Sequence, residues 1–159
     1  MRVCIGGTFD VLHKGHKELI SRAFKEAGRN GFVFIGVADG DLASKKETKH
    51  TFEERRKTVE SYVSMINNGT NYKIDRITDK YGPSVSEDYD VIVVSSETRV
   101  TAEEINNIRR DKGMRLLRIV TIPMVLADDD KPISSTRIKK KEIDAEGRII
   151  KKHRGGFID

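Results

Sequence analysis

Two histidines near the N-terminus lie in a segment whose residue types suit phosphate chemistry. The segment runs Gly6-Gly7-Thr8-Phe9-Asp10-Val11-Leu12-His13-Lys14-Gly15-His16 and follows a short apolar stretch. Glycines let a backbone approach a ligand closely, and the first N–H groups of a helix favour an anion. Imidazoles three residues apart at a helix start can point at one bound group. The segment therefore predicts a nucleotide-phosphate site, with candidate contacts from Gly7, Thr8, Phe9, His13, Gly15 and His16.

A second group of hydroxyl and basic side chains lies far along the chain. It comprises Ile133-Ser134-Ser135-Thr136-Arg137-Ile138-Lys139, directly after a proline. A single Ser or Thr before a helix is explained by N-capping. Three consecutive hydroxyls followed by cations exceed what capping requires, and they suit the β- and γ-phosphates of a triphosphate. We therefore expect Ser134, Ser135 and Thr136 to contact a nucleotide.

Two further cations follow predicted strands. Lys45 lies in the polar segment after the second predicted strand, and Arg99 lies just beyond the most apolar one. A guanidinium offers a planar pair of donors for phosphate. Loop cations are commonly solvated surface residues, so the assignment of both to a site depends on the rest of the chain.

The sequence gives little support for a metal held by the protein. No Cys, His or Asp cluster supplies further ligands beside His13 and His16, so phosphate contact is favoured over zinc ligation. The run Asp128-Asp129-Asp130 has the oxygen ligands that Mg²⁺ prefers, but a solvated loop is the simpler interpretation. We expect no protein metal site.

Length and composition indicate one soluble domain. The chain has 159 residues, 35% of them charged, and no apolar run approaches the ~20 residues that span a bilayer. No signal peptide is expected, because Arg2 precedes a short strand and a glycine turn. Cys4 is the sole cysteine, which excludes an intrachain disulfide. A cytoplasmic protein is expected.

The net charge of +5 raises the alternative of a basic nucleic-acid-binding domain. The basic residues are interleaved with acidic ones over most of the chain, with an excess only at residues 137–141 and 151–154. A solvated surface plus a phosphate-binding cluster accounts for this charge. The pattern argues against nucleic acid as the principal partner.

Strand and helix patterns alternate along the chain. Apolar or alternating runs predict strands at residues 2–5, 32–38, 72–77, 90–95 and 116–122. Helical spacing predicts helices at residues 16–27, 51–66, 101–112 and 134–141. Thr51 with Glu54, and Thr101 with Glu104, predict capping boxes. Residues 39–50 are predicted to form a loop, and the tail after about residue 142 to be loosely ordered.

This alternation predicts an α/β fold, a single-domain Rossmann-like doubly wound parallel sheet of about five strands over residues 1–159. Such sheets bind ligands at the carboxyl ends of their strands. Thr8 and the segments after Ala38, Ser95 and Ile122 should therefore meet at one edge.

The two motifs resemble signatures of the nucleotidylyltransferase superfamily. His13-Lys14-Gly15-His16 is similar to its His-x-Gly-His motif. Residues 133–139 are similar to its Ile-Ser-Ser-Thr-x-Ile-Arg motif, with Lys139 in place of the final arginine.

Two loop patterns point to one family within that superfamily. Ser44-Lys45-Lys46, followed by Thr51-Phe52-Glu53-Glu54-Arg55, resembles phosphopantetheine adenylyltransferases. Ser96-Glu97-Thr98-Arg99 looks like their archaeal and eukaryotic branch, because bacterial members usually carry an arginine where Ser96 stands.

The resemblance implies transfer of the adenylyl group of ATP to 4′-phosphopantetheine, giving dephospho-coenzyme A and pyrophosphate in coenzyme A biosynthesis. We expect His16 to donate to the transition state, and Thr8 and Lys45 to hold the attacking phosphate. Arg99 and the hydroxyls of residues 134–136 would hold ATP. Mg²⁺ would be bound mainly through the ATP phosphates. Bacterial relatives form hexamers, so an oligomer is compatible with the resemblance.

Another nucleotidylyltransferase, such as a glycerol-3-phosphate cytidylyltransferase or an FAD synthetase, is the nearest alternative. Cytidylyltransferases tend to carry Arg-Thr-x-Gly-Ile-Ser-Thr-Thr at the second motif. This chain has Lys131-Pro132-Ile133-Ser134-Ser135-Thr136, without that arginine or glycine. The difference favours adenylyl transfer.

Overall fold

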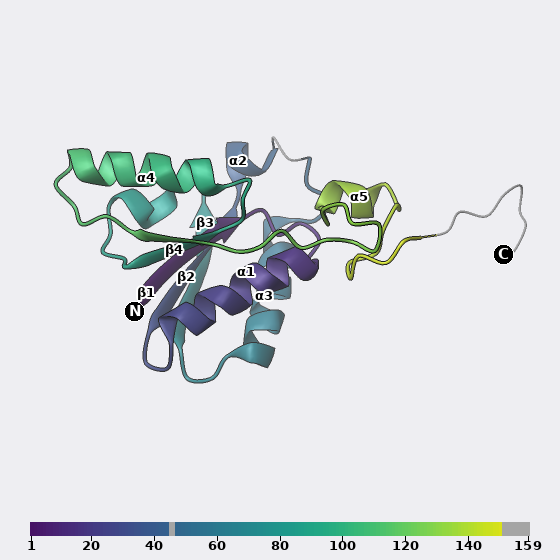
Figure 1. Ribbon diagram of the computed structural model, residues 1–159, viewed down its shortest axis with the longest axis horizontal. Helices are drawn as coiled ribbons and strands as arrows, with labels where there is room; N and C mark the ends of the chain where they lie inside the picture. Colours follow the sequence, from purple (N-terminus) through teal and green to yellow (C-terminus); the bar gives the residue numbers. More distant parts are fainter. Residues whose placement is uncertain (45–46, 151–159) are drawn as a thin grey trace, which may run out of the picture.

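The core of the molecule is a five-stranded parallel sheet. In a computed structural model, which describes residues 1–44 and 47–150, the strands are β1 (Arg2–Gly7), β2 (Phe32–Ala38), β3 (Asn71–Ile77), β4 (Val91–Val94) and β5 (Arg118–Thr121). They lie in the order β3-β2-β1-β4-β5, and each neighbouring pair is parallel (Figure 1). This confirms the predicted Rossmann-like α/β sheet.

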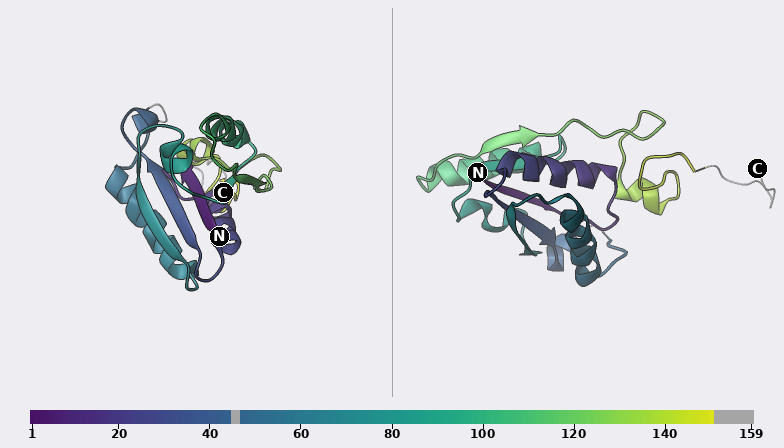
Figure 2. Two further views of the ribbon diagram at one scale, coloured as in Figure 1. Left: turned by 90° about the vertical axis from the view of Figure 1, so that its left-hand side faces the viewer. Right: turned by 90° about the horizontal axis from the view of Figure 1, so that it is seen from below.

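Helices cover both faces of this sheet (Figures 1 and 2). One face is covered by α1 (Lys14–Ala27) and α3 (Phe52–Ile66), and the other by α4 (Arg99–Asp111) and the 3₁₀ turn η1 (Gly82–Val85). Two short helices, α2 (Gly40–Ser44) and α5 (Ser135–Lys139), complete the described elements. The prediction of a loop throughout residues 39–50 is wrong for its first part, where α2 forms and buries Ala43.

The central strands send alternate side chains into two apolar layers. In β4, Val91 and Val93 pack beneath α1 and α3, whereas Ile92 and Val94 pack beneath α4. A strand that is buried on both faces needs apolar residues at every position, which explains the continuous apolar runs in the sequence. Each such side chain contributes roughly 1.5–3 kcal/mol on burial. The strands thus form a rigid support for the loops at their carboxyl ends.

Local capping explains where α3 begins but not where α4 begins. Thr51 and Glu54 form the predicted capping box at the start of α3, with reciprocal bonds of 3.2 and 2.9 Å. The capping box predicted at Thr101 is wrong, because α4 begins two residues earlier with Thr98 as its N-cap. The Glu104 carboxylate instead accepts a bond from the Tyr81 hydroxyl at 2.6 Å. A tertiary partner has therefore replaced the local one.

Residues 122–150, here called the C-terminal lobe, lie beyond the carboxyl ends of the strands (Figure 1). The lobe has its own small apolar cluster of Ala127, Ile133 and Ile143. An antiparallel bridge joins Ile143 to Ile149, so the segment expected to be loosely ordered after residue 142 is held as far as residue 150. Among the described residues, no helix is long and apolar enough to cross a membrane.

Candidate active site

The topology places a crevice between the carboxyl ends of β1 and β4. The chain runs from β1 outward to β3 on one side, then returns to β4 on the other side of β1. Doubly wound sheets bind their ligands where the strand order reverses in this way. The turn after β1 carries Thr8, and the segment after β4 leads to Thr98 and Arg99. The predicted convergence of these segments is therefore explained by the strand order.

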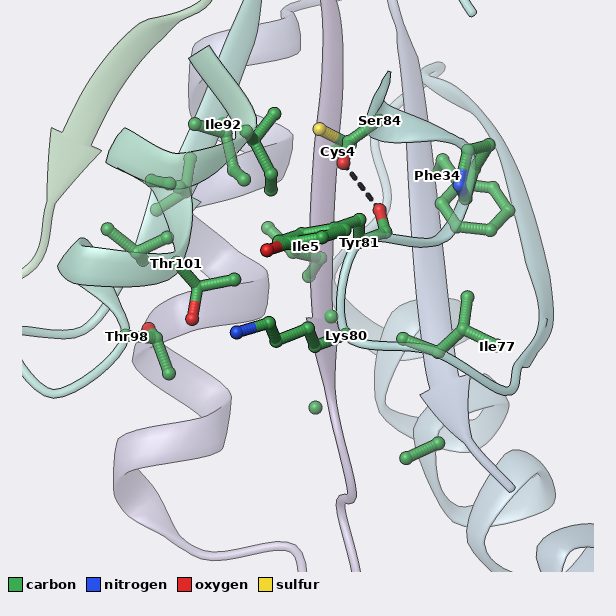
Figure 3. Close-up of a pocket in the computed structure, with 18 of the residues that line it drawn as sticks. Cys4, Ile5, Phe34, Ile77, Lys80, Tyr81, Ser84, Ile92, Thr98 and Thr101 are labelled. Carbon is green, nitrogen blue, oxygen red and sulfur yellow. Dashed lines mark hydrogen bonds between the residues drawn. The ribbon is translucent and has the colours of Figure 1, made fainter. Parts of the chain in front are cut away.

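An apolar cavity of about 320 Å³ opens at this crevice, on the face covered by α4 (Figure 3). It follows β1 from Thr8 inward to Cys4, and Phe34, Ile92 and Ile105 form much of its inner wall. Burial raises the pKa of the Cys4 thiol to about 12, so this end of the cavity is uncharged. The shape and lining suit a narrow, largely apolar group that enters at the sheet edge.

The mouth of the cavity is polar. Figure 3 shows the Lys80 ammonium pointing toward Thr98 and Thr101, with the Tyr81 ring beside it. The Lys80 Nζ and the Tyr81 hydroxyl both contact Glu104 Oε2, at 2.8 and 2.6 Å. These contacts place a cation and two hydroxyl side chains at the entrance, where they can meet the polar end of a ligand.

On the other face of the sheet, His13 and His16 form a stacked pair at the start of α1. Their ring centroids are 3.7 Å apart and the rings are nearly parallel, at 15°. The His13 Nδ1 accepts bonds from the backbone N–H groups of Gly15 and His16, at 3.0 and 3.3 Å. The His16 Nδ1 accepts in return from the His13 N–H at 3.3 Å. The two imidazoles are thus a capping box that begins the helix.

This arrangement fixes the protonation of both rings. Because each Nδ1 is an acceptor, each ring carries its proton on Nε2 and is neutral. Burial lowers the pKa of His13 to about 4, and burial together with the neighbouring His13 lowers the pKa of His16 to about 3. At neutral pH the pair therefore offers two N–H donors without positive charge.

The first N–H groups of α1 already have partners within the protein. The N–H groups of Gly15 and His16 are bonded to His13, and the Lys14 N–H donates to the Ala145 carbonyl at 2.9 Å. The Lys17 N–H continues the helix by donating to the His13 carbonyl. A phosphate at this turn would therefore meet the imidazole N–H groups, and its contact with them stays a prediction.

Gly15 and Phe9 have structural reasons for their positions. A Cβ at Gly15 would lie 2.9 Å from His13 Cε1, so any larger residue would displace the capping ring. Phe9 adopts a positive φ of 52° and is 1% exposed. Its ring lies 5.1 Å from the His16 ring, so it supports that imidazole from the core. Direct nucleotide contact by Phe9 remains a prediction.

The other predicted residues are placed as follows. Ser134 is the N-cap of α5, and its hydroxyl accepts a bond from the Arg137 N–H at 3.2 Å. Arg99 is the first residue of α4 and bonds Thr121 Oγ1 at 2.8 Å, with its side chain about half exposed. Lys45, the candidate contact for the reacting phosphate, lies outside the described residues. Its role stays a prediction.

Two buried charged residues near the site were assigned no role from the sequence. Asp10 is 6% exposed and Arg55 is 2% exposed, and both bond to the backbone of the segments around β1 and β2. Asp10 could have been noticed as a carboxylate placed directly after a buried strand. Arg55 ends the Thr51–Arg55 pattern, but that pattern does not show its bonding role, because its partners are distant backbone carbonyls.

The residues present do not form a metal cage. Within residues 1–44 and 47–150, no group of three His, Cys, Asp or Glu side chains is arranged to hold a metal ion. In the Asp128–Asp130 run, the Asp129 carboxylate is paired with Arg137.

Comparison with known proteins agrees with this architecture. A family model described as cytidylyltransferase-like matches residues 4–141. The phosphopantetheine adenylyltransferases of Methanothermobacter thermautotrophicus and Methanosarcina barkeri are 46% and 42% identical, covering 98% and 94% of this chain and 93% of each relative. The crystal structure of an Archaeoglobus fulgidus protein of unknown function is 35% identical, with a TM-score of 0.70 over 84% of this chain and all of that one.

The family model and the archaeal relatives show that the chain is a nucleotidyltransferase, and the histidine pair after β1 and the hydroxyl-bearing turn before α5 agree with this class. The family model spans most of the chain, and the archaeal relatives align with nearly the whole chain. The chain belongs to the cytidylyltransferase-like family, in its archaeal phosphopantetheine adenylyltransferase branch. The resemblance drawn from the two motifs is confirmed.

Proposed function

We propose that this chain transfers the adenylyl group of ATP to 4′-phosphopantetheine, giving dephospho-coenzyme A and pyrophosphate. An oxygen of the acceptor phosphate attacks the α-phosphorus of ATP, and the bond from that phosphorus to the bridging oxygen of pyrophosphate breaks. The nucleophile is already ionised, so the reaction requires no strong general base. Positioning and charge stabilisation supply the catalysis.

The two substrates would occupy neighbouring parts of the crevice. ATP would lie at the turn after β1, with Arg99 at the start of α4 and the Ser134–Thr136 turn holding its phosphates. The acceptor would lie on the α4 side, with its phosphate at Thr8 and Lys45. His16 would donate its Nε2 proton to the charge that grows on the phosphates. Neutral imidazoles suit this role because they donate a bond without holding the ground-state phosphate as tightly as a cation would.

Magnesium would enter as part of the substrate, Mg-ATP, and would help pyrophosphate leave by neutralising its charge.

We assign the protein to the cytoplasm as part of the proposal.

The observation that carries the choice of acceptor is the cavity along β1. From Cys4 to Thr8 it follows four residue steps of a strand, about 13 Å. Glycerol phosphate would leave most of this length unused. A phosphate carrying a long, slender arm matches both the length and the lining.

The first experiment is pyrophosphate release with Mg-ATP and 4′-phosphopantetheine, beside reactions with CTP plus glycerol 3-phosphate and with ATP plus FMN. Release only in the first reaction supports the proposal. Release in another reaction would refute the acceptor.

A matched pair of α4 variants tests the cavity. Thr101→Phe adds a ring at the cavity mouth and should raise the KM for 4′-phosphopantetheine at least tenfold with little change in the KM for ATP. Val100→Phe adds the same ring at a neighbouring position that is 62% exposed, and it should leave the acceptor KM within about twofold. Equal effects of the two variants would contradict placement of the arm in this cavity.

A further inference from the structure

The carboxylate of Asp10 is a buried junction between segments that are far apart in the sequence. It lies in the turn after β1 and is 6% exposed. It accepts bonds from the backbone N–H of Lys49, at 2.8 and 3.0 Å to its two oxygens, and from the N–H of His50 at 2.9 Å. The carboxylate thereby holds the backbone of residues 49–50, just ahead of α3.

The same carboxylate also holds the second motif. Lys139, the last residue of α5, forms an ion pair with Asp10 Oδ2, and its Nζ lies 3.4 Å from the Glu47 carbonyl. The Lys139 side chain is about one quarter exposed, whereas that of Asp10 is 3% exposed. Three parts of the site, namely the turn after β1, residues 47–50 and α5, therefore meet at one group.

The C-terminal lobe has few other attachments near this point. The Lys14 N–H donates to the Ala145 carbonyl at 2.9 Å, and Lys17 pairs with Glu146 at 3.2 Å on the surface. An exposed pair of this kind contributes about 0.2–1 kcal/mol. The contact of Lys139 with a buried carboxylate is the better shielded of the two ion pairs.

Arg55 binds the same parts of the chain through their backbone carbonyl groups. Its guanidinium donates to the carbonyls of Thr8 and Ala38, at 2.8 and 2.7 Å, and to the His50 carbonyl at 3.2 Å. Asp10 therefore holds the N–H side of residues 49–50, and Arg55 holds the carbonyl side of residue 50. The backbone of the loop is fixed from both directions against the turn that carries Thr8.

We propose that Asp10 is a positioning residue, which sets the second motif and residues 47–50 in register with the turn after β1 through Lys139 and the backbone of residues 49–50. This inference rests on the proposed function for its effect on turnover. The geometric part, however, concerns the protein without substrate and can be tested separately.

Asparagine cannot reproduce this junction. Its side chain keeps one acceptor oxygen but turns the second into an NH₂ group, which would face a backbone N–H donor and a lysine ammonium. Loss of the negative charge also leaves Lys139 without its buried partner. Asp10→Asn should therefore release both the loop and α5 while keeping the size of the side chain.

The variants for the test are Asp10→Asn, Lys139→Met, Lys139→Arg and the control Glu146→Gln. The control removes the exposed ion pair between the lobe and α1 but leaves the Asp10 junction intact. Amide hydrogen exchange at Lys49 and His50 is measured by NMR in the substrate-free protein. Pyrophosphate release then gives kcat and the KM for ATP of each variant.

We expect Asp10→Asn to accelerate exchange at both amides at least tenfold and to lower kcat/KM for ATP at least tenfold. Lys139→Met should lower kcat/KM for ATP while exchange at Lys49 and His50 changes less than threefold, and Lys139→Arg should restore most of the loss. In the double variant, Asp10→Asn with Lys139→Met, the loss should be smaller than the product of the single losses.

Unchanged exchange at both amides in Asp10→Asn would overturn the inference even if the protein had a different activity. So would independent, multiplicative effects of the Asp10 and Lys139 changes on kcat/KM. If Asp10→Asn does not fold, failure of Lys139→Arg to exceed Lys139→Met in turnover overturns it. Absence of pyrophosphate release from the unaltered protein would instead refute the proposed reaction, and the exchange measurements would still decide the geometric part.

Discussion

Replacing Gly15 by alanine should separate catalysis from stability. The new Cβ would lie 2.9 Å from His13 Cε1 and 3.1 Å from its Nδ1. Carbon atoms in ordinary contact are about 3.5–4.0 Å apart, so the ring must move by roughly 0.6–1.1 Å. His16 must move with it, because the two rings are stacked and each caps the backbone of the other.

The expected cost to folding is small. The two bonds to His13 Nδ1 contribute about 1 kcal/mol each, and alanine in place of glycine in a helix returns up to about 1 kcal/mol. The free energy of unfolding should therefore fall by about 1 kcal/mol. A displacement of about 1 Å at a catalytic group costs on the order of 10²-fold in rate. The signature is a folded protein whose kcat is about a hundredfold lower.

Urea denaturation and pyrophosphate release measure the two quantities on the same sample. Glu18→Ala is the control, since it introduces an alanine one turn later at an exposed position, with a smaller change in helix propensity. Its kcat should remain within about twofold. A Gly15→Ala protein with unimpaired turnover would refute the argument that the capping geometry aims the imidazoles.

Three other changes test the histidine pair and the buried arginine of α4. His16→Ala should lower kcat by at least ~10²-fold, the scale for one preorganised donor, and near-normal turnover in a folded variant would contradict its role. The pKa values of His13 and His16 are lowered in the folded protein, so the unfolded chain binds protons first as the pH falls below about 6.5. Stability that is present at pH 7 is therefore lost on acidification. The free energy of unfolding should fall by roughly 1.2 kcal/mol per histidine at pH 5.5. Urea denaturation at both pH values should show about half of that loss in His16→Asn; a full loss in the variant would count against the neutral pair. Arg109→Leu removes donors from three backbone carbonyls at 2.7–2.8 Å and should cost about 3 kcal/mol, or roughly 6–12 °C in Tm by circular dichroism, whereas exposed Arg110→Leu should change Tm little.

Strands and capping boxes that depend on local pattern could be predicted from the sequence. The second strand has the predicted bounds, Phe32–Ala38, because a continuous apolar run has one favourable environment in a sheet covered on both faces. The Thr51 capping box needs only residues three apart, and it also forms as predicted.

Features that depend on distant partners could not be predicted in this way. Glu104 is committed to Tyr81 across the cavity mouth rather than to its own helix start. The His13 ring turns back onto the backbone, where its Nδ1 caps the first turn of α1, and it stacks on the His16 ring. This orientation does not follow from spacing alone. The role of Asp10 depends on Lys49 and Lys139, which lie 39 and 129 positions further along the chain. No local pattern reveals such contacts.

The activity of the protein at high temperature should depend on the first turn of α1, where the reciprocal histidine cap forms. End turns of helices open with less free energy than the core of a sheet. When the first turn of α1 frays, the bonds that orient both imidazoles break together, although the strands beneath remain paired. Activity should therefore fall at temperatures below the cooperative unfolding transition. It should return on cooling, because the sheet has not unfolded.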